Sequence, residues 1–206
     1  PKENPIKEDA EINPTTTYGV TKCITEKFLF DIHKQFSNKL RIAILRYFNP
    51  IGAHESGLIG EWPLGKPNNI FPLLNLAGLG ITESFQVFGN DWPTKDGTCV
   101  RDYIHVMDIA SGHICALKYL LENEAQVICL NLGTGKGTTV LELINTYQEI
   151  NSVSFNIEFI DRRDGDIVEA VANNLLAKEK LNWVPKRSIQ DMCRDGFKWQ
   201  KNLYKI

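Results

Sequence analysis

The amino-acid sequence predicts an α/β fold in which strands alternate with helices. An amphipathic helical pattern over residues 18–34 is followed by a short apolar run at residues 40–48. Later in the chain, an apolar run that begins at residue 127 leads through a glycine-rich turn into a helical pattern at residues 140–150. Such alternation is typical of α/β proteins, because parallel strands need crossover connections that are usually helical.

The first helix and strand follow from the spacing of apolar side chains. Residues 40–48, LRIAILRYF, form a nearly continuous apolar run, which is typical of a buried parallel strand. A helix joined to such a strand by a few residues is the second half of a βαβ unit. The apolar stripe of the helix repeats about every 3.6 residues, and we expect it to face a core: Val20, Ile24, Phe28, Leu29, Ile32 and Phe36.

The middle of the chain begins with a segment that has no regular pattern. Residues 49–70 are dense in Gly, Pro and Asn, and a loop of that length in a compact domain is usually functional. The sequence then predicts a helix at 71–79, a strand at 84–89, a turn-rich connection at 90–98, a strand at 99–106 and a helix at 107–122.

The last third of the chain continues the alternation. The strand that begins at residue 127 ends in the glycine turn LGTGKG, which precedes the helix at 140–150. The remaining predicted elements are strands at 155–161 and 168–174, separated by the charged turn RRDGD, and helices at 175–181 and 189–203.

Composition excludes several classes of function. The 206 residues carry a net charge of −2, which argues against nonspecific binding to nucleic acid or to anionic membranes, since both require a positive field. No apolar run approaches the ~20 residues of a membrane span, and no secretory signal pattern is visible. Five scattered cysteines without a C-x-x-C pair indicate reduced thiols in a cytoplasmic protein without a metal site: Cys23, Cys99, Cys115, Cys129 and Cys193.

Tyr18 and Lys22 are the first candidates for chemistry. Residues four apart on a helix lie on one face, so the lysine ammonium can approach the phenol. A cation at ~4 Å stabilises a phenolate by about 4 kcal/mol at an effective dielectric constant near ~20, which suffices for a proton acceptor near neutral pH. The pattern Y-x-x-x-K also occurs often by chance, so spacing alone leaves both interpretations open.

The glycine turn at residues 132–137 could be mistaken for a phosphate-binding loop. It follows a strand and precedes a helix, but it lacks the spacing of the dinucleotide fingerprint and the Lys-Ser/Thr pair of a P-loop. We therefore predict a structural turn with a helix cap at Thr138 or Thr139.

Several arginines lie beside acidic residues. Arg101, Arg162 and Arg163 could form solvated ion pairs, the usual state of such charges. They could also clamp a diphosphate, for which the guanidinium geometry is well suited. Asp166, in the same charged turn, could accept hydrogen bonds from a ribose diol. The histidines show no spacing typical of metal ligands.

Six motifs occur in the order found in UDP-glucose 4-epimerases: YGVTK, LRYFNPIGAH, PNNIFP, VFGNDWPTKDGTCVRDYIHVMD, NLGTGKG and RRDGD. From about Thr17 to Trp199, the chain resembles this family of extended short-chain dehydrogenase/reductases. Two related classes, nucleotide-sugar 4,6-dehydratases and UDP-glucuronate decarboxylases, share Y-x-x-x-K, but the strand of their sugar domain reads more like GDGSQTRSFVYVDD.

The resemblance implies an isomerase, with NAD-dependent 4-epimerisation of UDP-glucose and UDP-galactose through a transient 4-keto intermediate. It makes Tyr18 the proton acceptor for the sugar 4-hydroxyl, and it assigns Lys22 to activating Tyr18 and binding the nicotinamide ribose. The backbone near Phe48 would approach the nicotinamide. The implied substrate contacts are Asn49 and Arg101 at the diphosphate, Arg163 at a phosphate, Asp166 at the uridine ribose, and Asn68, Asn69, Gln86, Val87 and Phe88 around the sugar and uracil.

Ala170 occupies the position at which the family sets substrate width. By resemblance, members confined to UDP-glucose and UDP-galactose carry a bulky Tyr four residues after the Asp of RRxGD, and members that accept N-acetylhexosamines carry a small residue. The alanine implies that UDP-GlcNAc and UDP-GalNAc are also substrates.

The resemblance also implies a division of the chain. We expect residues 1–49 to be the last part of a Rossmann-type NAD-binding domain. Residues 50–206 would be mainly the smaller α/β UDP-sugar-binding domain, with some segments returning to the Rossmann sheet. The polar residues 1–17 could be a disordered tail or, by resemblance, the loop before the tyrosine helix of an N-terminally truncated chain.

In the family, the glycine fingerprint and a catalytic Ser or Thr lie in the preceding half. The chain alone is therefore expected neither to bind NAD tightly nor to turn over, whereas the whole protein is expected to form a homodimer through the tyrosine helix. The alternatives are a non-catalytic module that binds a UDP-sugar or a partner chain, and a related nucleotide-sugar dehydratase or decarboxylase.

Overall fold

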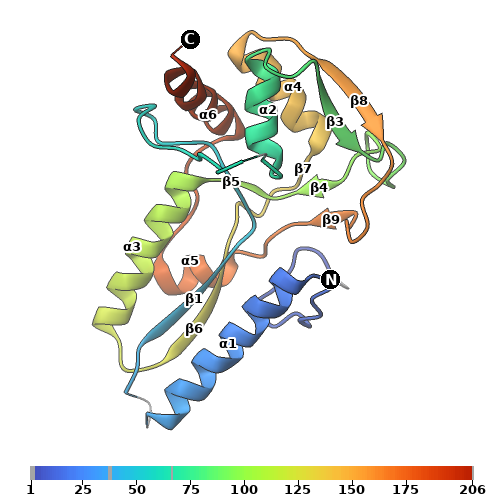
Figure 1. Ribbon diagram of the computed structural model, residues 1–206. Coiled ribbons are helices and arrows are strands. Elements are labelled where there is room, and N and C mark those ends of the chain that lie inside the picture. The colour runs from blue at the N-terminus through green and yellow to red at the C-terminus, as the bar shows by residue number, and fades with distance from the viewer. Residues whose placement is uncertain (1–2, 37–38, 66, 206) are drawn as a thin grey trace.

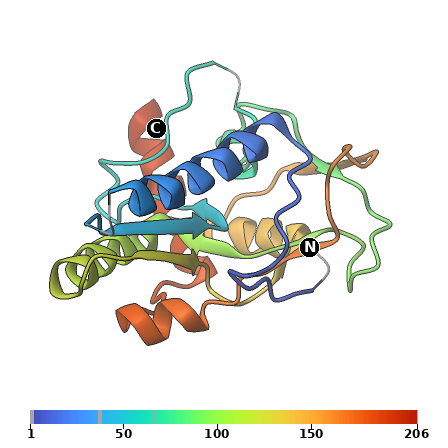
Figure 2. The same ribbon diagram turned by 90° about the horizontal axis from the view of Figure 1, so that it is seen from below.

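The computed structural model describes residues 3–36, 39–65 and 67–205, and it confirms the α/β class. Strands β1 (Ile42–Tyr47) and β6 (Val127–Leu132) pair in parallel along their whole length. Helix α1 (Thr17–Gln35) lies on one face of this pair, and α3 (Val106–Glu122) and α5 (Leu175–Leu181) lie on the other (Figures 1 and 2). The parallel strands covered by helices that the sequence predicts are therefore present, although no strand precedes α1 among the described elements.

One of two hydrophobic cores lies between β1, β6, α3 and α5. Its most buried side chains include Ile104, Leu130 and Leu132, and Trp183 is also buried in it. The Trp183 indole donates hydrogen bonds to the Asp108 carbonyl oxygen at 3.2 Å and to a serine hydroxyl at 2.8 Å. This core holds the segment after α5 against the strand pair.

The apolar stripe of α1 lies outside this core, so the expectation that it is buried was wrong. No residue of α1 is buried, and Ile24 and Phe28 are 62% and 59% exposed. In β1, Ile44 is the single buried residue, because β1 pairs only with β6 within the described part of the chain. Helical periodicity was predicted correctly, but within the described residues most of the stripe is exposed, and only Leu29 and Ile32 are half-buried.

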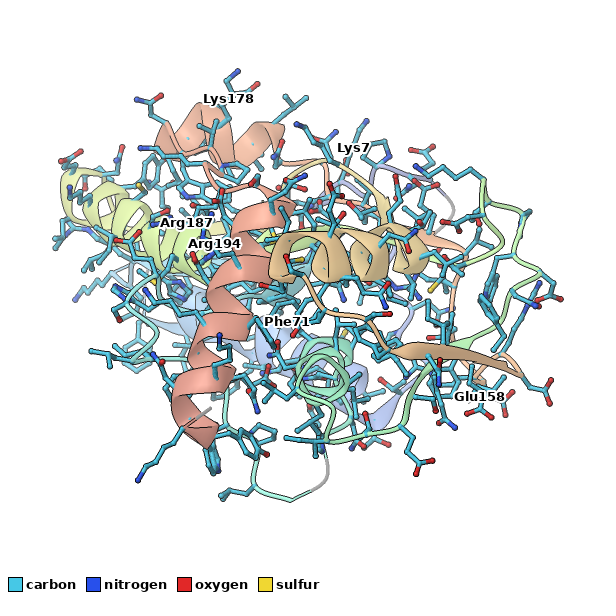
Figure 3. All side chains as sticks on the ribbon, turned by 90° about the horizontal axis from the view of Figure 1, so that it is seen from above. Lys7, Phe71, Glu158, Lys178, Arg187 and Arg194 are labelled. Atoms are coloured by element: carbon cyan, nitrogen blue, oxygen red, sulfur yellow. The ribbon has the colours of Figure 1, made fainter. Side chains whose placement is uncertain are left out.

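A second core lies among α2 (Ile70–Gly78), α4 (Val140–Asn151) and α6 (Ile189–Tyr204), beside the parallel pair of β3 (Ser84–Phe88) and β8 (Asn156–Ile160). Phe71 points from α2 toward α6 (Figure 3). A Cβ atom at Gly196 would lie 2.1 Å from its ring, so only glycine allows this close approach. The buried Tyr147 hydroxyl donates to Asn75 Oδ1 at 2.9 Å.

Short strands join the two cores. β2 (Asn49–Ile51) pairs in parallel with β5 (Tyr103–His105), and β4 (Val100–Arg101) lies between β7 (Thr138–Thr139) and β9 (Glu169–Ala170). The single strand predicted at residues 99–106 is thus divided at Asp102. Its buried carboxylate accepts hydrogen bonds from the backbone N–H groups of three residues on neighbouring segments: Thr134, Gly135 and Ala172.

Side-chain caps fix the starts of α4 and α6. Thr139 caps α4 in a capping box with Glu142, which confirms the cap that the sequence predicts after the glycine turn. Ser188 and Asp191 form the equivalent box at α6. Among the described residues, every helix is too short or too polar to cross a membrane.

The polar N-terminal segment is tied to strand ends rather than free. Ile6 forms a parallel bridge with Ala172 and accepts a hydrogen bond from the Asn131 side chain at 2.9 Å. The Arg46 guanidinium donates to the Glu8 carbonyl oxygen at 2.8 Å. Of the two interpretations of residues 1–17, these contacts favour a loop that packs on the domain.

Candidate active site

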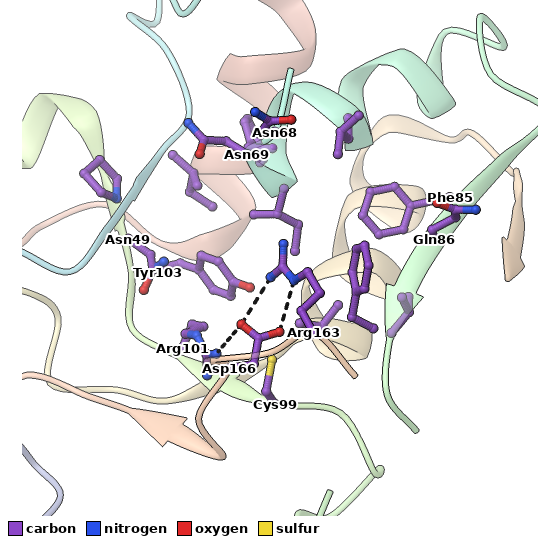
Figure 4. Close-up of a pocket in the computed structure, with 18 of the residues that line it drawn as sticks. Asn49, Asn68, Asn69, Phe85, Gln86, Cys99, Arg101, Tyr103, Arg163 and Asp166 are labelled. Atoms are coloured by element: carbon purple, nitrogen blue, oxygen red, sulfur yellow. Dashed lines mark hydrogen bonds and ion pairs between the residues drawn. The ribbon is translucent and has the colours of Figure 1, made fainter. Parts of the chain in front are cut away.

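Ten of the predicted site residues line one cavity of about 350 Å3, although they come from distant parts of the sequence. The cavity lies where β2, β3, β4 and the start of α2 meet the turn between β8 and β9 (Figures 1 and 4). The ten residues are Phe48, Asn49, Asn68, Asn69, Gln86, Val87, Phe88, Arg101, Arg163 and Asp166.

Two arginines meet at one carboxylate in this cavity. Asp166 Oδ1 lies 3.7 Å from Arg101 Nη2, and Asp166 Oδ2 lies 3.1 Å from Arg163 Nε (Figure 4). Gly165, with a φ of +86°, makes the turn that places Arg163 and Asp166 on the same side. The guanidinium of Arg163 also lies 4.4 Å from the centroid of the Phe88 ring, a cation–π contact. The two arginines and Asp166 together carry a net positive charge, which favours binding of an anion.

Arg162 does not take part in this arrangement. Its Nε donates to Asp91 Oδ1 at 2.7 Å, and its guanidinium lies 3.9 Å from the Trp92 ring centroid. All three arginines form ion pairs, Arg162 with Asp91 and the other two with Asp166. Only Arg101 and Arg163 line the cavity, so the diphosphate clamp stays a prediction for these two.

The asparagines approach from the opposite wall. Asn69 is the N-cap residue of α2, but its side chain makes no capping hydrogen bond. Its amide donates instead to Glu61 Oε1 at 3.1 Å. Asn49 lies in β2 opposite Tyr103. On the third wall, Gln86 Nε2 lies 3.4 Å from Glu158 Oε2, so the amide is held at the rim.

Sequence reasoning missed Cys99 and Tyr103, which also line the cavity. Burial raises the pKa of the Cys99 thiol and raises that of the Tyr103 phenol well above its usual range. The Tyr103 hydroxyl points into the cavity (Figure 4), and no residue in the described part of the chain forms a hydrogen bond with it. The sequence could have predicted both, because residues two apart in extended backbone point to the same face, and Cys99 and Tyr103 lie two residues before and after Arg101.

Tyr18 and Lys22 are not part of this cavity. Lys22 Nζ lies 5.2 Å from the centroid of the Tyr18 ring, as their helical spacing predicts, and Tyr18 is 71% exposed. Lys22 lines a separate open cavity of about 380 Å3 with the N-terminal segment and Arg46. Phe48 lines both cavities and so marks their boundary.

Ala170 and the glycine turn both lie outside the lining of the main cavity. Ala170 is outside its lining, on β9, where it pairs with Arg101 on β4. The glycine turn is structural, as predicted, because the Asp102 carboxylate binds the backbone N–H groups of Thr134 and Gly135 at 2.8 and 2.9 Å. Burial raises the pKa of Asp102, and hydrogen bonds oppose that rise.

The sequence of the chain matches a model of the GDP-mannose 4,6-dehydratase family over residues 1–196. The chain belongs to this family. A curated relative from Bacillus subtilis (strain 168), named UDP-glucose 4-epimerase, is 46% identical over 202 residues, which are 98% of this chain and 59% of the relative. The family carries the name of a dehydratase, one of the alternatives above, whereas this relative carries the name of an epimerase.

Solved structures give the same result. A UDP-glucose 4-epimerase from Stenotrophomonas maltophila, with bound NAD and formylated UDP-arabinopyranose, is 44% identical with a TM-score of 0.95, covering 100% of this chain and 60% of that one. A UDP-glucose 4-epimerase from Bifidobacterium longum, in complex with NAD+ and UDP, is 40% identical with a TM-score of 0.92, covering 98% and 60%. The resemblance and the Rossmann-type fold class are confirmed, and the chain spans about 60% of the length of these relatives.

Proposed function

We propose that this chain supplies the UDP-sugar cavity and the proton-transferring tyrosine of an NAD-dependent UDP-glucose 4-epimerase. The observation that carries the proposal is the convergence of ten predicted residues on one cavity. These residues span positions 48 to 166, so their proximity comes from the fold and not from closeness in the sequence. The bound NAD, UDP and UDP-sugar of the similar structures support the same assignment.

In this proposal the main cavity binds the nucleotide end of the substrate. Arg101 and Arg163 hold the diphosphate, because planar guanidinium groups match phosphate oxygens with two parallel hydrogen bonds. Asp166 orients both arginines, and its carboxylate also accepts hydrogen bonds from the ribose hydroxyls. Asn49 donates to the diphosphate, and the free Tyr103 hydroxyl adds a further polar contact. The Gln86–Phe88 strand and the asparagines before α2 enclose the uracil and the sugar.

Proton transfer is assigned to α1. The Tyr18 phenolate accepts the proton of the sugar 4-hydroxyl, and the Lys22 ammonium at its ring stabilises that phenolate. Lys22 and Phe48 line the same open cavity, which fits the predicted contacts of a nicotinamide ribose and ring. Tyr18, Lys22 and the backbone near Phe48 would hold NAD there, and the bound NAD would supply the reversible hydride acceptor that 4-epimerisation needs. Phe48 lines both cavities, so the reacting sugar carbon would lie near it.

The domain division and the assembly remain part of the proposal. The two hydrophobic cores support a Rossmann-type part that ends near residue 49 and a UDP-sugar part at residues 50–206, with α3, β6 and α5 returning to the first core. The exposed apolar stripe of α1 supports a homodimer through the tyrosine helix. The free thiols support a cytoplasmic location.

The small side chain of Ala170 supports a wider substrate range. By resemblance to the family, this position gates the space beside the sugar 2-substituent, although Ala170 is outside the cavity lining in the structure. On the resemblance we include UDP-GlcNAc and UDP-GalNAc among the proposed substrates.

The test is an assay of the whole protein, with the additional length that its relatives have, using UDP-galactose and NAD. We expect UDP-glucose as the product, and Tyr18→Phe should lower kcat by about 100-fold or more while the affinity for UDP stays unchanged. A 4-keto-6-deoxy sugar as the product would instead show a dehydratase. Binding of UDP without any turnover would show a non-catalytic module.

A further inference from the structure

His105 and Asp195 form a buried pair that links β5 to α6, outside the lining of the substrate cavity. His105 is the last residue of β5, Asp195 lies on α6, and the two residues are 0% and 3% exposed. Tyr103 and Ile104, which precede His105 on β5, belong to different hydrophobic cores. The pair therefore connects α6 to a strand that contributes side chains to both cores.

The hydrogen bonds of His105 fix the tautomer of its imidazole. The backbone N–H of Met107 donates to Nδ1 at 3.0 Å, so Nδ1 is an acceptor and caps the start of α3. Burial lowers the pKa of His105, although the hydrogen bond with Asp195 opposes this, and the lower pKa favours the neutral ring. The proton of the neutral ring then lies on Nε2, which donates to Asp195 Oδ2 at 3.3 Å. In the part of the chain that the structure describes, Asp195 provides the single acceptor for this proton.

Close packing leaves the imidazole little freedom to move. Gly52, just after β2, has a φ of +86°, and a Cβ atom there would lie 3.3 Å from both His105 Nε2 and Met192 Cα on α6. A buried N–H that loses its acceptor is costly, because it no longer has water to replace the lost hydrogen bond. Removal of the Asp195 carboxylate should therefore displace the imidazole and, with it, the end of β5.

The strand that carries His105 also forms part of the substrate cavity. Tyr103, two residues earlier on β5, lines the cavity, and so does Asn49, its register partner on β2. His105 is itself the register partner of Ile51 on β2. Two residues along an extended strand span only about 7 Å, so a shift at His105 reaches both cavity residues.

We propose that Asp195 is a positioning residue for the diphosphate end of the substrate cavity and that it acts through His105. Its carboxylate fixes the imidazole, the imidazole fixes the end of β5, and the paired strands place Tyr103 and Asn49 for the ligand. This inference rests on the proposed function, in which Asn49 donates to the diphosphate and Tyr103 adds a polar contact, whereas the Gln86–Phe88 strand encloses the uracil. Binding groups commonly need such buried support, because a displacement of about 1 Å weakens their contacts.

Calorimetric titration of the full chain with UDP and with uridine tests the proposal. Asp195→Leu should weaken UDP binding by about 5-fold to 20-fold and uridine binding by about twofold at most, because uridine lacks the diphosphate. Asp195→Asn keeps an acceptor for the imidazole and should bind UDP within about twofold of the unsubstituted chain. The matched control is Arg194→Gln, which removes the exposed second partner of Asp195 and should change neither affinity by more than about twofold. Equal losses for UDP and uridine, or no rescue by Asp195→Asn, would overturn the proposal.

NMR spectra of the same variants without ligand distinguish this proposal from the proposed function. The imidazole of His105 should show the Nε2–H tautomer, and Asp195→Leu should shift the backbone amide signals of Tyr103 and Asn49, which Asp195→Asn should restore. His105→Asn is a second variant, because its Oδ1 can cap α3 in place of Nδ1 while the hydrogen bond to Asp195 is lost. It should reproduce the shifts of Asp195→Leu.

Retained uridine binding shows that a variant is folded. Unmoved amide signals in both Asp195→Leu and His105→Asn, or an Nδ1–H tautomer of His105, would overturn the proposal. A chain that binds neither UDP nor uridine would refute the proposed function, and the amide signals would still decide whether Asp195 positions β5 and β2.

Discussion

The proposed diphosphate clamp predicts that Arg101→Gln weakens UDP binding far more than it weakens uridine binding. Arg101 Nη1 donates to the carbonyl oxygens of Val100 and Ile167, each at 2.8 Å. These bonds hold the guanidinium with Nη2 3.7 Å from Asp166 Oδ1, and the side chain is only 15% exposed. The group is therefore positioned before the ligand arrives, and binding costs little side-chain entropy.

The size of the effect follows from the chemistry of the contact. Two unit charges at ~4 Å attract by about 4 kcal/mol at an effective dielectric constant near 20, and desolvation of both groups opposes this attraction. A hydrogen bond to a charged group contributes a net ~1.5–3 kcal/mol. Since ~1.4 kcal/mol corresponds to tenfold in affinity, Arg101→Gln should weaken UDP binding by about 10-fold to 100-fold.

Isothermal titration of the chain with UDP and with uridine measures this prediction. Arg162→Gln is the matched control, because it removes the same charge from a residue that instead contacts Asp91 and Trp92. The control should change UDP affinity by about twofold at most, as expected for an exposed charge. The reasoning fails if both variants weaken UDP binding equally, since the loss would then come from the overall positive charge and not from a specific contact. It also fails if uridine loses as much affinity as UDP.

Further predictions concern the cofactor, substrate width, pH and assembly. The 206-residue chain should not bind NAD tightly, and a fluorescence titration that shows saturable micromolar binding would contradict this. In the whole protein, Ala170→Tyr should abolish turnover of UDP-GlcNAc but not of UDP-glucose, and equal loss of both would argue for damage to the cavity. Hydrogen bonds from Ser188 lower the pKa of Asp191 from 3.8 to about 2, so its stabilising contribution is present above the unfolded pKa and is lost as pH falls through this window. Denaturation curves of Asp191→Asn should therefore show a weaker pH dependence there, and an unchanged slope would remove Asp191 as the cause. Ile24→Glu should convert the proposed dimer of the whole protein into monomers in sedimentation experiments, because it places a charge in the apolar stripe; a variant that stays dimeric would exclude the α1 interface.

Local sequence patterns predicted most elements but not the division of the strand at residues 99–106. The break occurs at Asp102, whose carboxylate binds backbone N–H groups 32, 33 and 70 residues away. Apolar alternation reports only on neighbours in sequence, so it contains no information about such partners. The break matters for the site, because it directs β4 to β9 and β5 to β2 and brings Arg101 beside Asn49.

The cavity residues were predictable from family motifs to different degrees. Asn49, Arg101 and Asp166 lie within the family motifs, and all three line one cavity. Cys99 and Tyr103 lie in the same motif as Arg101 but were not assigned. A sequence motif identifies residues, but it does not show which side chains point into the cavity. The two-residue alternation around Arg101 would have identified both.

The helix that carries Tyr18 shows what periodicity leaves open. Its apolar stripe is regular, yet Ile24 and Phe28 are exposed, because an amphipathic pattern shows which face avoids water and not what covers that face. In the described structure, the Arg46–Glu26 pair connects α1 to β1, with contacts of 2.9 and 2.7 Å. Tyr18 lies on the same open helix, and a tuned phenolate requires a site that excludes water. The surface that covers Ile24 and Phe28 in the proposed epimerase would therefore also fix the orientation of α1, on which proton transfer by Tyr18 depends.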